Sequence, residues 1–183
     1  MASIIKANEL QDFNGNAIIT SDGSGNITLS SGMNTAVAAA GFTTDEFFLA
    51  YQGSDQSLSN NTWTKLAMDT LQISNSNYDT SNYKYTVPSG KAGTYMIGMS
   101  GNWLSAGDFD NCIIAIRKNG TNTVSCNIRQ EYYENQFCTK IVSLSVGDYL
   151  EPYGLQQSGG SLSFRAPGST ASNGFIYGYR IGA

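Results

Sequence analysis

Short runs in which apolar and polar side chains alternate recur along most of the chain. In the run 83–87, Tyr83, Tyr85 and Val87 share one face, which is the pattern of a half-buried strand. Pro88 ends this run, because proline cannot donate a hydrogen bond to a central ladder. Runs of the same kind predict further strands over 47–52, 63–68, 94–100, 112–116, 123–129, 136–146, 149–153 and 175–181.

The segments between these runs are polar and rich in turn-forming residues. Asn77, Asp79, Ser81 and Asn82 are residue types that hydrogen-bond to their own backbone and tolerate a left-handed conformation, so 77–82 is predicted to be a turn. Many short strands joined by polar turns are typical of an antiparallel β-sandwich, and we therefore predict an all-β fold. Further loops are expected over 54–61, 105–111 and 158–174.

Three strands leave a choice open. Both faces of 112–116 are apolar, which fits a central strand or one at a subunit contact. In 175–181, one set of alternating side chains lines the interior and the other faces outward, and the pattern does not say which. Pro152 predicts an edge strand or a bulge.

Gly93 and Gly178 are expected where the backbone needs freedom or another group approaches closely.

The first thirty-two residues form a separate pattern. A turn over 21–26 separates two short apolar runs, 17–20 and 27–30, and this predicts a hairpin. Such a hairpin buries too little surface to be stable alone. We therefore predict an anchor over 1–32, a linker or short helix over 33–45 and a sandwich domain over 46–183. The expected anchor contacts are Ile4, Ile5, Leu10, Ile18 and Ile19.

Composition narrows the range of partners and locations. Charged residues are only 13% of the chain and the formal net charge is −4, so a nucleic-acid backbone would be repelled. No run approaches the ~18 apolar residues of a membrane helix, and the N-terminus lacks a secretory core. We therefore expect no membrane insertion, and we expect the protein to stay in the cytoplasm of the cell that makes it. Three cysteines without a C-x-x-C pair are predicted to be small buried residues, namely Cys112, Cys126 and Cys138.

The chain offers little for catalysis. It has no histidine, which removes Ser-His-Asp and Cys-His constellations and the commonest metal ligand. The acidic pairs Asp108 with Asp110 and Glu131 with Glu134 are typical of solvated turns. Asp108, Asp110 and Asn111 offer oxygen ligands for calcium, but the twelve-residue loop with its bidentate glutamate is absent. We expect no enzymatic activity, no cofactor and no metal.

Tyrosine is the most suggestive residue type, with eleven in the chain. Aromatic faces stack on sugar rings, which suggests a carbohydrate site on the loops. Tyrosine is also favoured in strands and enriched at protein contacts, so most are expected in the core or at a subunit interface. The residues in question are Tyr132, Tyr133, Tyr149, Tyr153, Tyr177 and Tyr179.

Several landmarks occur in a recognisable order. They are Asn77, Tyr78-Asp79, Tyr85-Thr86-Val87-Pro88, Gly93-Thr94-Tyr95, Arg117-Lys118-Asn119-Gly120, Leu144-Ser145-Val146-Gly147-Asp148 and Phe175-Ile176-Tyr177-Gly178. This order resembles the globular domain of complement component 1q, and more loosely tumour necrosis factor, over residues 46–183. The resemblance implies a jelly-roll sandwich that forms a homotrimer. The expected trimer contacts are Ile114, Ile116, Phe175, Ile176, Tyr177, Gly178 and Tyr179.

The N-terminal segment has a resemblance of its own. The run from Ile18 through Thr28 is similar to N-terminal segments of bacteriophage virion fibre and decoration proteins. This resemblance implies a non-enzymatic virion protein that forms the homotrimeric knob of a head fibre, a capsid decoration or a tail fibre. Residues 1–32 would bind capsid or tail proteins, and a host-surface glycan is a further expected partner. The alternative is a complement-like adhesive or carbohydrate-binding module of a cellular protein, although neither a signal peptide nor a collagen repeat is present.

Overall fold

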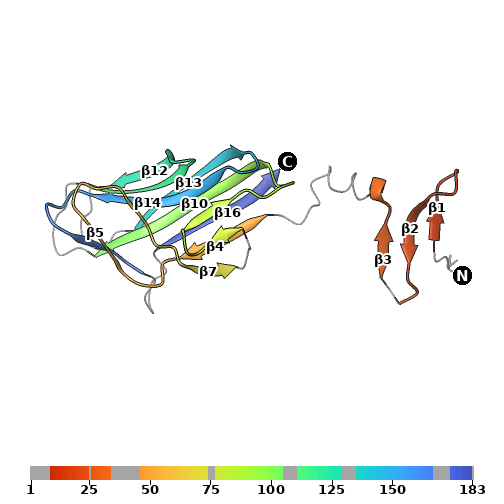
Figure 1. Cartoon of the computed structure of the whole chain (residues 1–183), viewed down its shortest axis with the longest axis horizontal. Helices are drawn as coiled ribbons and strands as arrows, with labels where there is room; N and C mark the ends of the chain where they lie inside the picture. The colour runs from red at the N-terminus through yellow and green to blue at the C-terminus, as the bar shows by residue number, and fades with distance from the viewer. Residues whose placement is uncertain are drawn as a thin grey trace, which may run out of the picture. The chain divides into compact units, whose positions relative to one another are not determined.

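The structure is a computed structural model that describes residues 9–24, 26–33, 46–73, 77–104, 111–128, 135–166 and 174–182. The chain divides into two compact units, 1–44 and 45–183 (Figure 1). The described secondary structure consists almost entirely of antiparallel strands, which confirms the all-β prediction. Most of the predicted linker, 34–45, and the anchor residues Ile4 and Ile5 lie outside the described residues.

The smaller unit contains an antiparallel sheet in the order β1-β2-β3. The predicted hairpin is confirmed as β2 and β3, and β1 adds a strand that the sequence pattern did not predict. Leu10, Ile19 and Leu29 stand opposite one another across the three strands. No residue of these strands is buried. The strands are β1 (Glu9–Gln11), β2 (Ala17–Ser21) and β3 (Ile27–Leu29).

The first sheet of the larger unit is built around one long strand, β10 (Gly93–Leu104). Most of β10 lies between β13 (Asn135–Leu144) and β16 (Phe175–Gly182). Beyond β16 the sheet continues through β4 (Phe47–Tyr51) to β7 (Thr70–Ile73). The last two residues of β10 pair instead with β15 (Leu162–Phe164), which pairs with β5 (Gln56–Leu58).

The second sheet follows the order β12-β11-β14-β9-β8, with β6 also paired to β14. β11 (Cys112–Lys118) is central, as one interpretation of its apolar faces predicted. A two-residue turn with Asn119 and Gly120 at positive φ joins it to β12 (Thr121–Ile128). The remaining strands are β6 (Thr64–Lys65), β8 (Tyr78–Asp79), β9 (Lys84–Thr86) and β14 (Tyr149–Gln156).

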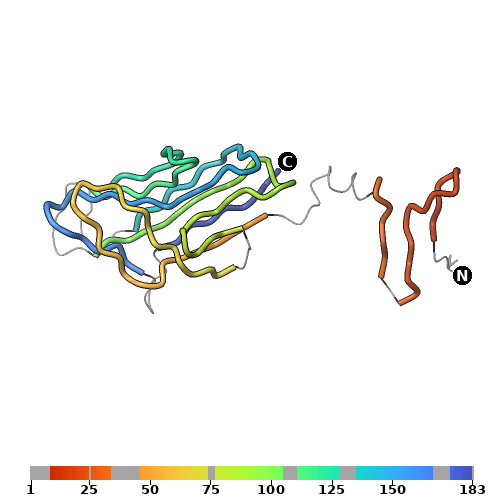
Figure 2. Tube along the Cα trace, viewed as in Figure 1, coloured from red at the N-terminus to blue at the C-terminus, as the bar shows by residue number. Residues whose placement is uncertain are grey.

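The long-range pairings of the larger unit are nested. β11 pairs with β12, β10 with β13, β9 with β14 and β4 with β16, so each pair encloses the one before it in the sequence. Figure 2 shows the result, since the C-terminal strand in blue runs alongside the first strand of the sandwich in orange. Successive nested pairs therefore belong alternately to the second sheet and to the first.

An aromatic stack occupies the core at one end of the sandwich. The ring of Phe48 lies 4.3 Å from that of Tyr85 and 5.5 Å from that of Tyr78, measured between centroids. The Tyr85 hydroxyl is 3.3 Å from that of Tyr95, which donates to the Lys91 carbonyl at 2.6 Å. Burial raises the pKa of Tyr78, Tyr85 and Tyr95. Three tyrosines among the sequence landmarks therefore have a structural role.

Two further landmarks meet at one ion pair. The Lys118 ammonium lies 2.8 Å from Asp148 Oδ2, and Asn119 Nδ2 donates to Asp148 Oδ1 at 2.7 Å. The Ser145 amide also donates to this carboxylate. Although burial acts to raise it, these hydrogen bonds lower the pKa of Asp148 to about 2. The 117–120 hairpin and the 144–148 turn thus hold each other in place.

Three predictions about local structure are wrong. Tyr83 has a φ of +50°, so it belongs to the turn and the strand begins at Lys84. β5 and β15 occupy segments that were predicted to be loops. Pro152 lies in a central strand, where its carbonyl accepts from the Leu66 amide. Its missing N–H points to the same side, where the neighbour of β14 changes from β9 to β6, so no ladder bond is lost.

Candidate interaction surface

The outward side of the first sheet is unusually rich in aromatic and aliphatic side chains. Strand register aligns them in three rows across β13, β10, β16, β4 and β7. The rows are Phe137, Ser100, Phe175 and Tyr51; Thr139, Gly98, Tyr177, Leu49 and Ile73; and Ile141, Met96, Tyr179 and Phe47. We call these residues the aromatic face. None of them is charged.

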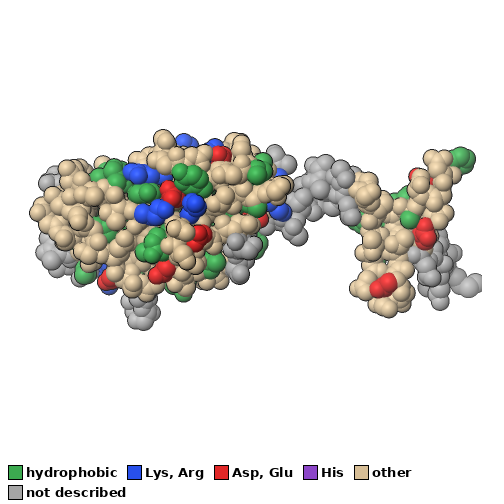
Figure 3. Space-filling model, in the orientation of Figure 1, with side chains coloured by type: hydrophobic (Ala, Val, Ile, Leu, Met, Phe, Trp, Pro, Cys, Tyr) green, Lys and Arg blue, Asp and Glu red, His purple; other side chains and the backbone are tan. Residues whose placement is uncertain are grey.

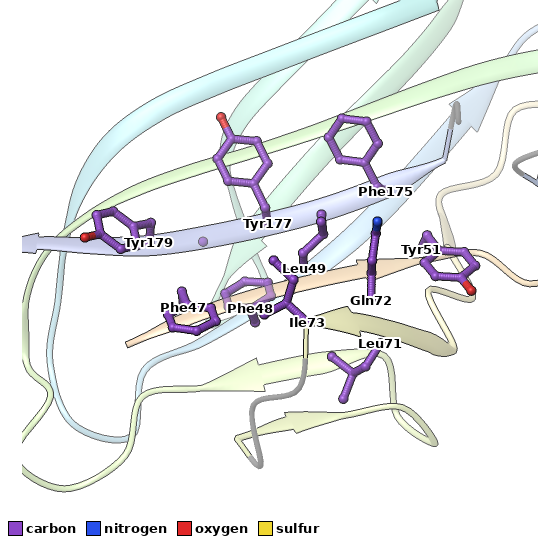
Figure 4. Close-up of a pocket in the computed structure, with 11 residues that line it drawn as sticks. Phe47, Phe48, Leu49, Tyr51, Leu71, Gln72, Ile73, Phe175, Tyr177 and Tyr179 are labelled. Atoms are coloured by element: carbon purple, nitrogen blue, oxygen red, sulfur yellow. The ribbon is translucent and has the colours of Figure 1, made fainter. Parts of the chain in front are cut away.

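A groove of about 1060 Å³ runs along the β16, β4 and β7 part of this face. Figure 4 shows its aromatic side chains, with Tyr177 and Phe175 rising from β16 and Phe47 and Tyr51 from β4. Leu71, Gln72 and Ile73 complete the wall on β7. Gln72 contributes the one side-chain amide among these lining residues, so the groove offers mainly apolar contact.

Gly98 allows one ring to lie flat on the sheet. A Cβ at this position would come within 2.5 Å of the Tyr177 ring, so the ring occupies the space that a side chain would need. The Tyr177 hydroxyl is 3.2 Å from Thr139 Oγ1 on β13, so the ring spans β10. Phe175 packs beside Tyr177 with a centroid distance of 6.3 Å. The middle of the aromatic face is therefore ordered by its own contacts.

The structure divides the expected trimer contacts into two groups. Phe175, Tyr177 and Tyr179 lie on the aromatic face. Ile114, Ile116 and Ile176 are fully buried in the sandwich core, and Gly178 lies beneath Phe48. A side chain that packs inside its own chain has no surface left for a neighbour, so the three isoleucines are removed from the expected contacts, whereas Gly178 also lines the groove.

Several members of the aromatic face were missed by the sequence reasoning. Phe137 and Ile141 on β13 are 52% and 62% exposed, whereas Gln136 and Cys138 between and beside them are buried. The Gln136 amide is satisfied, because it accepts from the Trp103 indole at 2.8 Å and donates to the Cys112 carbonyl. Glutamine is usually exposed and phenylalanine is usually buried, so β13 shows the reverse of the usual arrangement. This reversal is the signal that could have identified the surface.

Most residues that were considered for catalysis or metal binding lie outside the described part of the chain. Within the described residues, no group of three His, Cys, Asp or Glu side chains is placed to hold a metal ion. Asn111 donates to Gln157, while Asp108, Asp110, Glu131 and Glu134 lie outside the described residues, as do Tyr132 and Tyr133. Cys112 and Cys138 are buried as predicted, and Cys126 is half-buried.

No described helix has the length and hydrophobicity needed to cross a membrane. Comparison with known proteins finds no protein-family model that matches the chain and no significant match among curated proteins.

Proposed function

We propose that this chain is a non-enzymatic structural protein of a bacteriophage virion, in which the sandwich forms a homotrimeric knob and the N-terminal unit is the anchor. The observation that carries the proposal is the aromatic face. It lies on one side of the sheet, contains no charged residue and exposes side chains that a monomer would normally bury.

The composition of this face favours another copy of the same chain as its occupant. Monomeric proteins rarely expose large continuous apolar patches. Phenylalanine, tyrosine and methionine are enriched in the centres of protein interfaces, where charged residues are depleted. Because the face has no charge, identical copies can bring it together without like-charge repulsion. Closed symmetric assemblies of one chain are the commonest way to bury such a surface.

The strand order supports a jelly roll as the scaffold. In a jelly roll, a long antiparallel ribbon folds over so that the first strand pairs with the last and the inner strands pair in turn. The nested pairs β4 with β16, β9 with β14, β10 with β13 and β11 with β12 follow this order. This agrees with the resemblance to the complement component 1q domain, whose members are trimers.

The smaller unit supports an anchoring role. Leu10, Ile19 and Leu29 form an apolar row on one face of a single-layer sheet, and Ile27 lies on the same strand as Leu29. Leu10 and Ile27 are exposed within this unit. A three-stranded sheet needs a packed face for stability, so this face is expected to bind another virion protein.

Self-association is tested by multi-angle light scattering of the full chain. We expect three times the monomer mass of 19.6 kDa at micromolar concentration. Ile141→Lys places a charge on the aromatic face and should give monomers. The matched control is Val146→Lys, which changes a residue of similar exposure in the 144–148 turn. A monomeric wild-type protein, or equal dissociation by both variants, would refute the proposed interface.

The virion location is tested separately by imaging purified phage particles with a gold-labelled antibody against residues 46–183. Regular labelling of heads or tails supports the proposal. Label that is absent from particles and found on cell surfaces would favour the alternative, a complement-like adhesive module of a cellular protein.

A further inference from the structure

The outer side of the second sheet has a different character from the aromatic face. Tyr85, Ile116 and Leu150 point into the core, so the residues next to them in β9, β11 and β14 point outward. The outward side chains are polar or aromatic rather than aliphatic. Figure 3 shows such a mixture of basic, acidic and hydrophobic side chains gathered on one face of the larger unit. The residues of interest are Trp63, Lys65, Lys84, Arg117, Tyr149, Glu151 and Tyr153.

All three cations on this surface have an acidic neighbour, since Arg117 stands opposite Glu151 in the β11–β14 pair, but only the two lysines are compensated by close contacts. Lys65 Nζ lies 2.5 Å from Glu151 Oε1 and also donates to the Asn82 carbonyl. Lys84 stands opposite Asp79 in the β8–β9 pair, and its ammonium lies 5.2 Å from the centre of the Tyr149 ring. The charges of both lysines are thus largely compensated within the chain.

Arg117 is held in a different way. Its guanidinium carbon lies 3.9 Å from the centre of the Tyr153 ring and 5.0 Å from that of Trp63. Its Nε donates to Asn122 Oδ1 at 2.9 Å. Among the described residues, no carboxylate lies within ion-pair distance of Arg117, and neither Nη group has a hydrogen-bond acceptor.

These contacts prepare the guanidinium to bind an anion. The two rings and the Asn122 amide restrict its rotation, so little conformational entropy remains to be lost on binding. The two Nη groups present parallel donors whose spacing matches the two oxygens of a carboxylate. Stacking on aromatic rings compensates the positive charge only in part, and it leaves the edge of the guanidinium with the two Nη groups open.

We propose that Arg117, together with Trp63 and Tyr153, binds a carboxylate of an acidic saccharide. The guanidinium supplies the charge complement, and the half-buried Trp63 and Tyr153 side chains beside it supply apolar contact for the sugar ring. Ligand sites commonly combine aromatic side chains with a few fixed polar groups.

This inference rests on the proposed virion role and goes beyond it, by naming a chemical class for the host-surface glycan that the sequence analysis expected as a partner. The two proposals fail independently, because the arginine site and the aromatic face belong to different sheets. A protein that binds acidic sugars but does not self-associate would support the arginine site and refute the interface at the aromatic face. A protein that self-associates but does not bind acidic sugars would support the interface and refute the arginine site.

The test is isothermal titration calorimetry of the full chain with hexagalacturonate and with its methyl ester, which has the same sugar rings without the charges. We expect binding of the acid and at least about tenfold weaker binding of the ester, as for loss of a charge-assisted hydrogen bond. Sialyllactose and its methyl ester provide a second pair. Failure to bind either acid, or equal binding of an acid and its ester, would overturn the proposal.

Variants locate the site. Arg117→Lys keeps the charge but loses the planar fork, and Arg117→Gln loses both, so we expect each to weaken binding about tenfold or more. Lys140→Gln makes the same change in net charge at an exposed residue of β13 and should bind like wild type. Unchanged binding by Arg117→Lys, or equal weakening by Lys140→Gln, would refute the assignment. Tighter binding of hexaglutamate than of either saccharide would show a peptide site instead.

Discussion

Substitution of Gly178 by valine tests how tightly the two sheets are packed at the aromatic stack. A Cβ added to Gly178 would lie 2.4 Å from Cε1 of Phe48 and 2.9 Å from its Cζ. These distances are shorter than real Cβ contacts. The Phe48 ring cannot move aside easily, because it is buried and stacks on Tyr85 at 4.3 Å.

The expected cost follows from this geometry. Overpacking of a core typically costs ~1–3 kcal/mol, and a rigid ring with a neighbour behind it points to the upper end of that range. For a chain of this size, each kcal/mol lowers the melting temperature by about 2–4 °C, so Gly178→Val should melt roughly 6–12 °C below wild type.

Thermal unfolding followed by circular dichroism measures the effect. Gly182→Val is the matched control, because it lies on the same strand and its Cβ would meet only the Thr94 side chain at 4.0 Å. The control should melt close to wild type. If both variants melt at the wild-type temperature, or if both melting temperatures fall equally, the close approach of Phe48 to the β16 backbone does not limit packing.

Three further predictions concern other parts of the chain. Asp148→Asn should flatten the acid-induced fall in melting temperature. Folding lowers the pKa of this carboxyl from 3.8 to about 2, so the carboxylate stabilises the fold above pH 3.8 and loses this effect as the pH falls towards 2. Identical acid profiles of the variant and the wild type would contradict the role of the pairing with Lys118. Gln136→Leu removes the acceptor of the Trp103 indole and should cost ~1–3 kcal/mol in urea unfolding, so an unchanged midpoint would show that the bond is dispensable. A protein comprising residues 45–183 should keep the assembly state of the full chain but not bind phage particles lacking the protein, and equal binding by both would place attachment in the sandwich.

The sequence predicted the fold class and many of the strands because alternation survives wherever one face is buried. Tyr95, Ile97 and Met99 alternate with other residues along the predicted strand 94–100, and all three are fully buried on one face of β10. Close approach at Gly178 was also predicted correctly. Shorter strands were missed, because β5 and β15 have only three residues each and contain serine, so they look like polar loops.

The candidate surface was harder to predict because alternation divides residues into two faces without saying which is buried. In β16, Phe175 and Tyr177 are larger than Ile176 and Gly178, yet the smaller pair faces the core. The reason lies in a strand far away in sequence, since the Phe48 ring fills the space above Gly178. Arg117 gave no signal either, because its two aromatic neighbours come from separate segments of the chain.

The nested pairing of the larger unit has a consequence for folding kinetics. β16 lies between β10 and β4, yet it is the last of the sandwich strands to be synthesised. Until it is in place, the edges of β10 and β4 that it joins remain unpaired, and such edges are sites of aggregation. Pairing strands that are more than a hundred residues apart also makes folding slow. The chain therefore spends the period of its own synthesis with its central sheet incomplete, and a defect in its final strand is expected to reduce the yield of soluble protein more than one in its first.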